Sequence, residues 1–548
     1  MSAPSPTFQR RLGLFDAVML VIGTMIGSGI FVVSADIARD VGGAGWLLAV
    51  WGLAGLMTIL GALSYAELAS MMPAAGGQYV FLREAYSPLW GFLYGWTCFL
   101  VIQTGSIAAV AVVFAKYLGV LVPELGTDPV KNALWTVENV NVQLTLPFMA
   151  EPFYTLKDFV VTRGQLVAVA VIAFLTWLNC RGVKEGKTVQ NVLTVAKTLA
   201  LVLLIIVGLF MVSSPHARLE NWNDPWGGIS ASKSFAGVSK LLGNSGLLAA
   251  LMVMGGAMVG ALFSADAWNN VTFTAGETVN PKRNLPLSLV IGTGSVILLY
   301  LLANVAYVEC LPIQGNAAQA TTLEKEARSA AVRAEELERM GQAEPAAAAR
   351  LQEESARRTA AYYRGIAHAA EDRVGTAVME LLSPRYAAPF MAIAIMISTF
   401  GCVNGMILMG ARLYYVMAQD NLFFSAVGTL NRRSVPATGL IVQGLWSTLL
   451  VFSGTYNELL DYVIFAVLVF YVLTVSGLFI LRRKRPDAER PYKAFGYPVL
   501  PALYVLLCAV IMIDLLIVKP KLTWPGLIIV LTGIPVYFLW RAVGKRKA

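Results

Sequence analysis

The residues best suited to bind a polar solute lie in the middle of the first long apolar stretch of the chain. The segment reads Gly23-Thr-Met-Ile-Gly-Ser-Gly-Ile-Phe31, with three glycines and a serine among nine residues. Each glycine inside a helix costs about 1 kcal/mol relative to alanine, so an uninterrupted helix is disfavoured here. Backbone that leaves a helix at membrane depth is tolerated only where it is buried in protein or lines a cavity. The segment therefore predicts a break whose freed amides and carbonyls face a polar solute.

A helix broken at this point has two ends of opposite polarity. If the outer half begins at Gly27 to Gly29, with Ser28 between them, its free N–H groups form a positive end that suits a carboxylate. The inner half would end near Met25, where unpaired carbonyls suit an ammonium. Such a site fits a zwitterion without charged side chains. Taken alone, the spacing Gly23-x-x-x-Gly27 is equally compatible with close helix packing.

A second apolar span is interrupted in the same way. The segment from Gly255 to Asn270 has small residues in its middle, followed by the carboxylate of Asp266 and the amide of Asn269. The first and sixth spans open two successive five-span halves, and because five is odd the halves have opposite orientations in the membrane. Paired interrupted helices in corresponding positions indicate a transporter's binding site, so the second break favours binding over simple packing.

Several side chains of the sixth span could act at such a site. A carboxylate inside a membrane costs about 2.5–3.5 kcal/mol on insertion scales, so Asp266 is expected to face protein or a water-filled cavity. There it could sense a cation, carry a proton or hydrogen-bond a neighbouring unwound segment. Phe263 and Trp268 could close over a bound solute, unless they are ordinary core residues. Ser264 and Asn269 complete the candidates of this segment.

Lys197 is predicted to lie near the centre of the membrane. The fifth span starts near Thr188, so Lys197 lies about nine residues, or about 14 Å, along a helix that crosses an apolar core about 30 Å thick. A buried ammonium needs carbonyl or hydroxyl partners, or it loses its proton. Carbonyls of the unwound first span and the hydroxyls of Ser398 or Thr399 are the expected partners, where the ammonium would replace a bound sodium ion. The alternative is that the side chain snorkels to the membrane surface.

The composition is that of a membrane protein. Of the 548 residues, 57% are hydrophobic and 14% are charged, and the mean hydropathy is +0.65. Apolar stretches of about 20 residues span a bilayer as helices, and there are about twelve of them. They lie at residues 13–35, 44–71, 89–119, 163–180, 188–212, 247–273, 287–310, 383–418, 437–454, 458–481, 498–518 and 525–541.

The basic residues indicate the orientation of the chain. With twelve spans, all basic clusters fall on one side together with both ends of the chain. The clusters are Arg10-Arg11, Arg181/Lys184/Lys187, Lys282-Arg283, Arg432-Arg433, Arg482-Arg483-Lys484-Arg485 and Lys545-Arg546-Lys547. An excess of Lys and Arg marks the cytoplasmic side, so both ends are predicted to be cytoplasmic. The formal net charge of +9 then needs no nucleic-acid partner.

No metal, cofactor or catalytic centre is predicted. The two histidines, His216 and His368, lie in predicted loops, and the five cysteines lie in or beside different spans. Charged residues near the cytoplasmic ends of the spans could instead form an inner gate. The residues assigned to gating are Glu67 and Arg412 on the inner path and Phe263 and Trp268 on the outer path.

One segment of the chain has the composition of a soluble helix. Residues 317–373 are rich in Ala, Glu and Arg, with charge pairs at i,i+4 such as Glu353 and Arg357 that support a helix. Gly341 and Pro345 are expected to divide it into two helices. Counting spans places it outside, either as a solvated decoration or as a docking surface for a partner or a second protomer. The predicted divisions are 1–212 (tail, spans one to five), 213–316 (outer loop, spans six and seven), 317–373 (insertion), 374–485 (spans eight to ten) and 486–548 (spans eleven and twelve, tail).

Motifs spread along the chain resemble those of the amino acid–polyamine–organocation superfamily and, within it, the L-type amino acid transporter-like branch, here as a bacterial-type member. They cover nearly all of the chain outside the insertion. The motifs are Gly23-Thr-Met-Ile-Gly-Ser-Gly-Ile-Phe31, Gly61-Ala-Leu-Ser-Tyr-Ala-Glu-Leu68, Gly76-Gly-Gln-Tyr79, Asn280-Pro-Lys-Arg-Asn-Leu-Pro286, Phe400-Gly-Cys-Val-Asn-Gly405, Arg485-Pro-Asp-Ala-Glu-Arg-Pro491 and Gly533-Ile-Pro-Val-Tyr537.

The resemblance implies the LeuT-type fold, an all-α membrane protein with twelve transmembrane helices. Two inverted five-helix repeats would make up its core, with helices one and six unwound in mid-membrane. The residue roles that it implies are carboxylate-binding amides at Ser28 and Gly29, amine-binding carbonyls at Met25, Phe263 and Asp266, a gating aromatic at Phe263, a supporting amide at Asn269 and a lysine in place of sodium at Lys197.

The chain departs from this family in two places. Asp266-Ala267 stands where animal members have Gly-Gly before the tryptophan, which alters the expected pocket. The outer loop between spans three and four has no cysteine, whereas animal members use one there to link to a glycoprotein subunit, so no disulfide-linked heavy chain is expected.

The expected function is sodium-independent exchange of neutral L-amino acids, by alternating access, in the bacterial inner membrane. Two alternatives within transport remain open: a proton-coupled amino acid symporter that uses Lys197, and a cationic amino acid or polyamine antiporter that uses Asp266. A receptor that senses the substrate without translocating it is the alternative from another class.

Overall fold

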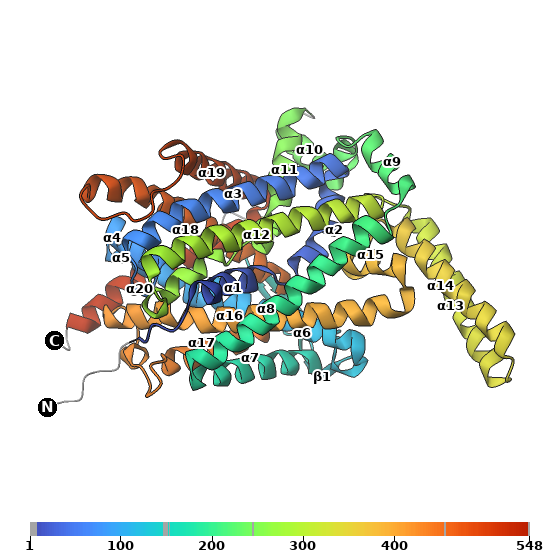
Figure 1. Cartoon of the computed structure of the whole chain (residues 1–548), viewed down its shortest axis with the longest axis horizontal. Coiled ribbons are helices and arrows are strands. Elements are labelled where there is room, and N and C mark those ends of the chain that lie inside the picture. Colours follow the sequence, from blue (N-terminus) through green and yellow to red (C-terminus); the bar gives the residue numbers. More distant parts are fainter. Residues whose placement is uncertain (1–7, 146–151, 153, 244–245, 454–455, 546–548) are drawn as a thin grey trace.

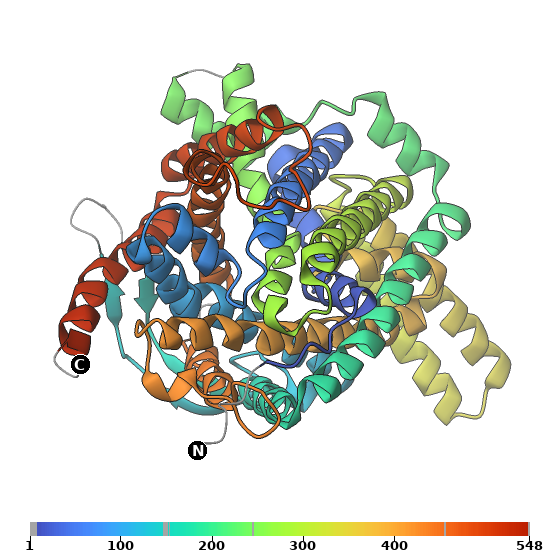
Figure 2. The ribbon, with the colours of Figure 1, turned by 60° about the vertical axis from the view of Figure 1, so that its left-hand side comes forward.

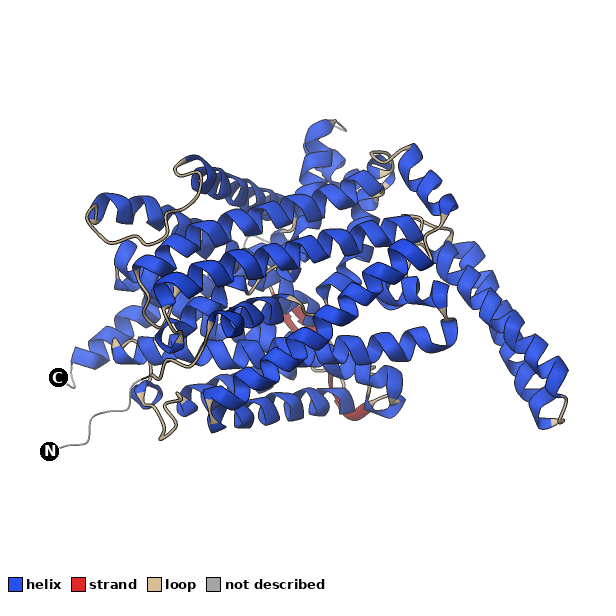
Figure 3. Cartoon of the chain, viewed as in Figure 1, coloured by secondary structure: helices blue, strands red, loops and turns tan. Residues whose placement is uncertain are grey.

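The computed structural model describes residues 8–145, 152, 154–243, 246–453 and 456–545. The predicted tail before Phe8 and the basic residues Arg546 and Lys547 lie outside this part of the chain. Within it the protein is almost entirely helical (Figure 3). Among the described residues, 11 helical segments are long and apolar enough to cross a membrane. The chain is therefore a multi-pass membrane protein, as its composition predicted.

The membrane-spanning helices follow the predicted apolar stretches. In chain order they are α1 (Leu14–Met25) continued by α2 (Gly29–Val41), α3 (Ala44–Met71), α5 (Pro88–Thr97) continued by a π-helical turn (Cys98–Ile102) and α6 (Gln103–Leu121), α7 (Arg163–Arg181), α8 (Val183–Ile206) continued by a π-helical turn (Val207–Met211), α11 (Leu247–Ser264) continued by a 3₁₀ helix (Trp268–Glu277), α12 (Pro281–Cys310), α16 (Pro384–Gln419), α18 (Tyr456–Lys484), α19 (Val499–Val518) and α20 (Pro520–Lys545).

One predicted span differs from the others. The stretch 437–454 contains α17 (Ala437–Val451), which is apolar but shorter than the 11 spanning segments, and residue 454 lies outside the described part of the chain.

The remaining elements lie in the connections. The helices are α4 (Gln78–Ala85), α9 (Pro215–Asn223), α10 (Lys233–Leu242), α13 (Ala317–Arg339), α14 (Ala343–Arg364) and α15 (Val374–Leu382), with 3₁₀ turns at Pro123–Leu125, Ile229–Ala231, Ala370–Asp372 and Ser425–Gly428. Four strands between α6 and α7 form two antiparallel pairs. They are β1 (Ala133–Val137) with β4 (Phe159–Thr162), and β2 (Val142–Leu144) with β3 (Tyr154–Leu156).

Both predicted interruptions lie inside the helix bundle. α1 packs against α8, α12 and α16, and α2 packs against α11 (Figure 2). α3 lies along α12, so the first half of the chain packs against the second there as well. Each half begins with a broken span, which is the arrangement of the predicted LeuT-type fold.

Two sides of the bundle are distinguished below. The basic side carries the end of α7, the start of α12 and the end of α18, with Arg181, Lys282 and Arg482. The hairpin side is the opposite one, from which α13 and α14 project beyond the bundle (Figure 1).

The projecting segment is a helical hairpin held together by alanines. The buried alanines are Ala320, Ala327, Ala330 and Ala334 of α13 and Ala346, Ala349, Ala356, Ala360 and Ala361 of α14. Glu353 and Arg357, the pair that supported the prediction of a helix, are in contact at 2.8 Å, and Glu324 pairs across the hairpin with Arg364 at 2.6 Å. The expectation for Pro345 was wrong: it lies in the first turn of α14, where proline lacks no helical hydrogen bond.

Candidate functional site

The first break lies where the glycine-rich segment predicted it. α1 ends at Met25, Ile26 leaves the helix with φ −74° and ψ 97°, and α2 begins at Gly29. Among its described residues, the structure gives no acceptor to the backbone amides of Gly27, Ser28 or Gly29. Unpaired amides at the start of a helix attract an anion, so this end of the break can hold a carboxylate.

Lys197 is buried beside this break, with 1% of its surface exposed. Its Nζ donates to the carbonyls of Gly23 and Ile26 in the unwinding span, the latter at 2.8 Å, and to the carbonyl of Ser398 at 3.1 Å. The Ser398 hydroxyl donates to the carbonyls of Ile26 and Gly27 at 3.1 and 2.8 Å. The ammonium therefore occupies a cage of oxygens that joins α1, α8 and α16, and the side chain does not snorkel.

Thr399 does not take part in this cage. Its hydroxyl donates at 2.8 Å to the carbonyl of Ile395 in its own helix. Consecutive residues of a helix point about 100° apart, so only one of Ser398 and Thr399 can face the break. The expectation that either hydroxyl would meet Lys197 is corrected accordingly: Ser398 contributes its carbonyl to Lys197, and its hydroxyl caps neighbouring carbonyls of the break.

The second break follows Ser264. α11 ends there, Ala267 adopts a left-handed conformation with φ 66°, and a 3₁₀ helix continues from Trp268. Within the break the Asp266 amide donates to the Phe263 carbonyl at 3.1 Å. The Ser264 hydroxyl donates at 2.8 Å to Gly260 of its own helix, so it is turned towards α11.

Tyr300 of α12 ties the two breaks together, and the sequence analysis did not find it. Its hydroxyl lies 2.9 Å from the Met25 carbonyl and 3.1 Å from the Ser264 carbonyl. The Thr24 hydroxyl also reaches the Ala267 carbonyl across the gap, at 3.3 Å. A tyrosine in an apolar helix has no distinguishing pattern, because only the folded chain brings it to the broken segments.

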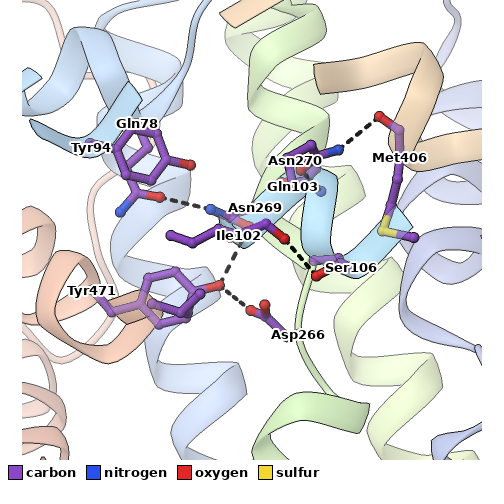
Figure 4. Close-up of a pocket in the computed structure, with 12 residues that line it drawn as sticks. Gln78, Tyr94, Ile102, Gln103, Ser106, Asp266, Asn269, Asn270, Met406 and Tyr471 are labelled. Atoms are coloured by element: carbon purple, nitrogen blue, oxygen red, sulfur yellow. Dashed lines mark hydrogen bonds between the residues drawn. The ribbon is translucent and has the colours of Figure 1, made fainter. Parts of the chain in front are cut away.

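A polar cavity adjoins the second break (Figure 4). Its volume of about 20 Å³ is enough for roughly one water molecule. The Tyr471 hydroxyl donates to Asp266 Oδ1 at 2.5 Å, and Asn269 donates to Gln78 at 2.8 Å. On the opposite wall, Asn270 donates to Gln103 at 3.2 Å. Asp266 thus faces a buried polar network.

The two candidate gating aromatics lie in different surroundings. Phe263 lines, together with Ser28, a cavity of about 440 Å³ whose wall includes Arg39 and Lys116 near the hairpin side. Trp268 is buried, with its ring centre 4.8 Å from that of Tyr65. Phe263 therefore borders the path from the hairpin side to the first break, whereas Trp268 is packed in an aromatic cluster.

Ion pairs join the helices at the basic side, but Glu67 and Arg412 do not pair with each other. Arg412 of α16 contacts Glu277 at 3.0 Å, and both side chains are buried. Glu67 of α3 is fully buried and accepts hydrogen bonds from Arg482 at 2.9 and 2.6 Å. Arg490 lies 3.3 Å from the same carboxylate. Each predicted gating residue thus links helices of different parts of the bundle.

Replacing Gly29 with alanine is expected to lower the free energy of unfolding by about 1–3 kcal/mol, the usual cost of overpacking. A Cβ atom on Gly29 would lie 2.0 Å from Ser264 Oγ and 3.2 Å from Ser264 Cα, so the two breaks would have to move apart. Thermal unfolding in detergent measures the effect. Gly294→Ala is the matched control, because its Cβ would meet nothing within 4 Å. Equal melting temperatures for the two variants would show that the breaks do not touch.

Comparison with known proteins identifies this architecture. The profile of the family described as "Amino acid permease" matches residues 12–330 and 365–539, and the internal segment that it leaves out, 331–364, falls within the hairpin. The chain is 28% identical over 538 residues to the human b(0,+)-type amino acid transporter 1, covering 97% of this chain and 88% of that protein. It is also 28% identical over 543 residues to the mouse large neutral amino acids transporter small subunit 2, covering 97% and 81%. The chain belongs to the amino acid permease family, a family of membrane transporters and not of enzymes.

Proposed function

We propose that this protein is a sodium-independent amino acid carrier, and that it exchanges neutral L-amino acids by alternating access. The observation that carries the proposal is the junction of two broken spans beside a buried ammonium. The amides of Ser28 and Gly29 would hold the substrate carboxylate. The relatives named above are amino acid transporters by name, which agrees with a zwitterionic substrate.

Carbonyls at the two breaks would hold the substrate ammonium. Met25, Phe263 and Asp266 provide them. The Met25 carbonyl already accepts from Tyr300 and the Phe263 carbonyl from the Asp266 amide. A carbonyl oxygen has two lone pairs, so the Met25 carbonyl can accept a second hydrogen bond from a substrate. Tyr300 would then sense the substrate indirectly, because it shares an acceptor with it.

Lys197 would make sodium unnecessary. Carbonyl oxygens freed by an unwound helix are typical ligands of a coupling sodium ion. Here the ammonium donates to two of them, the carbonyls of Gly23 and Ile26, and carries the same charge. Substrate binding should therefore need no added cation.

The conformation fits the outward-facing stage of such a cycle. The cavity that reaches Ser28 and Phe263 lies towards the hairpin side, while buried ion pairs of Arg412 and Glu67 join helices at the basic side. We propose that the basic side is cytoplasmic, following the distribution of Lys and Arg, and that the membrane is a bacterial inner membrane. The cycle would require these ion pairs to separate when the site opens inwards.

A cationic amino acid or polyamine antiporter is the second candidate, and Asp266 favours it. Its carboxylate lines the small polar cavity next to the second break and receives one hydrogen bond from Tyr471. A carboxylate there could pair with a cationic substrate side chain. Proton symport through Lys197, with the lysine releasing its proton during the cycle, is the other coupling to be tested.

We further propose that the carrier acts without a disulfide-linked heavy chain, because the loop between α6 and α7 has no cysteine. One of the relatives named above is called a small subunit. The hairpin of α13 and α14 is the segment available for contact with another partner or a second copy.

Uptake of a panel of labelled amino acids into proteoliposomes tests the function. In sodium-free buffer, neutral L-amino acids are expected to enter only vesicles that contain an internal amino acid. Uptake into empty vesicles driven by an inward proton gradient would indicate symport. Competition by lysine, arginine, agmatine or putrescine would indicate the cationic carrier, and binding without any uptake would indicate a receptor and overturn the proposal.

A further inference from the structure

Asp514 is a buried carboxylic acid outside the binding site. It lies on the protein-facing side of α19, near the buried residues Ile511 and Leu515, and only 8% of its surface is exposed. Within the described residues neither Oδ1 nor Oδ2 has a hydrogen-bond partner. Buried polar groups are nearly always hydrogen-bonded, so this carboxyl group needs an explanation.

The carboxyl group fills a notch in α11. A Cβ atom placed on Gly255 would lie 2.3 Å from Asp514 Oδ2, so the acid occupies the space that a side chain would take. The same helix carries Phe263 and Ser264 at its other end, eight residues or about 12 Å further along. Any shift of α11 along or away from α19 must therefore separate Gly255 from the Asp514 carboxyl group.

The charges around Asp514 are few. α3, α11, α18 and α20 pack against α19, and α11 presents Gly255 and Gly256, which have no side chain. Lys519 directly follows α19, five residues after Asp514 in the chain. Lys519 lines the 440 Å³ cavity with Gly256, and its Cε would lie 3.8 Å from a Cβ on that glycine. The ammonium is thus at the cavity wall, and no hydrogen bond from it reaches the acid in the described structure.

A neutral acid suits these surroundings better than an ionised one. An unpaired carboxylate that is buried in protein is expensive, and this cost is avoided when the group holds a proton. A metal cation is a poor alternative, because hard cations require about six oxygen ligands and the described structure places no partner on either carboxyl oxygen.

We propose that Asp514 is a proton-binding site that couples pH to the position of α11. The Asp514 carboxyl group is protonated while it packs against Gly255, as in this outward-open conformation. When α11 moves, water and Lys519 reach the carboxylate and the proton is released. Acid therefore favours the outward-open state. This coupling goes beyond the proposed exchange and does not depend on which amino acid is carried.

Dicyclohexylcarbodiimide, an apolar reagent that modifies protonated carboxyl groups in membranes, tests the site in the full-length protein. Mass spectrometry of the treated protein is expected to find an adduct on Asp514, with about tenfold less adduct per pH unit once the acid titrates. Gly255→Ala should expel the acid from its notch and reduce the adduct at neutral pH several-fold, whereas Gly294→Ala should not. An unmodified Asp514, or an adduct that is independent of pH, overturns the proposal, and this test needs no transport activity.

Asp514→Asn tests the coupling, because asparagine has the same shape and cannot ionise. In proteoliposomes at equal internal and external pH, the wild type is expected to show an apparent KM for external amino acid several-fold lower at about pH 6 than at about pH 8. Asp514→Asn should keep the low apparent KM at both pH values. Glu124 is an exposed acid at the hairpin side, and Glu124→Gln should show the same pH dependence as the wild type. An unchanged pH dependence in Asp514→Asn overturns the coupling but leaves the exchange proposal intact.

Discussion

The Lys197→Ala variant is expected to lose amino acid exchange by at least about 100-fold. Removing the ammonium leaves the Gly23 carbonyl without its donor and takes one of two donors from the Ile26 carbonyl, which keeps the Ser398 hydroxyl. A buried polar group without a partner costs about 1–3 kcal/mol, and about 1.4 kcal/mol of barrier corresponds to tenfold in rate, so the upper part of that range corresponds to the expected loss. The measurement is counter-substrate-dependent uptake in proteoliposomes, with equal amounts of reconstituted protein.

Three further variants separate the charge from its position. Lys197→Arg should also be inactive, because a planar guanidinium does not fit a cage built for a compact ammonium. Ser398→Ala removes the hydroxyl that donates to the carbonyls of Ile26 and Gly27 but leaves the ammonium in place. A partial loss of exchange is therefore expected. Thr198→Ala is the neighbouring control, because in the described structure the Thr198 hydroxyl donates to the Thr194 carbonyl of its own helix. Wild-type exchange by Lys197→Ala would contradict the role given to this lysine.

The breaks and the lysine could be predicted because their signals are local. Glycines inside an apolar stretch weaken the helix where they stand, and the depth of Lys197 follows from counting residues along its span. The boundaries of α3 and α16 likewise follow from where apolar residues begin and end. α8 and α12 begin five and six residues before their predicted stretches 188–212 and 287–310, because their first turns are polar, and α17 ends at Val451, before the end of the stretch 437–454.

The contacts between spans could not be predicted in the same way. Tyr300 meets Met25 from 275 residues away, and Tyr471 meets Asp266 from 205 residues away, so no local pattern records either contact. Ser398 and Thr399 were indistinguishable without the rotation of α16 about its axis. The charges at the basic side were visible in the sequence, but opposite charges can pair in many ways, and only the packed helices select the partners.

Breaking the ion pair between Arg412 and Glu277 is expected to lower the free energy of unfolding by about 3–5 kcal/mol, because either single substitution leaves an uncompensated buried charge. The pair is 3.0 Å long, joins α16 to the end of the 3₁₀ helix, and is almost completely buried. Arg412→Met and Glu277→Gln should each reduce the melting temperature in detergent. The first should have the larger effect, since a lone carboxylate remains and Arg412 also donates to the Leu408 carbonyl.

The double variant distinguishes a gate from a simple structural contact. Arg412→Met with Glu277→Gln removes both charges, so much of the stability should return, because a neutral buried pair has no charge to desolvate. If the pair also closes the basic side, its loss should favour the inward-open state and raise the apparent KM for external amino acid even in the stable double variant. Arg485, which pairs with Glu84 at the exposed rim, provides the control. Arg485→Gln should change neither the melting temperature nor the apparent KM for external amino acid. A double variant with wild-type KM would leave the ion pair as a stabilising contact that the transport cycle does not need to break.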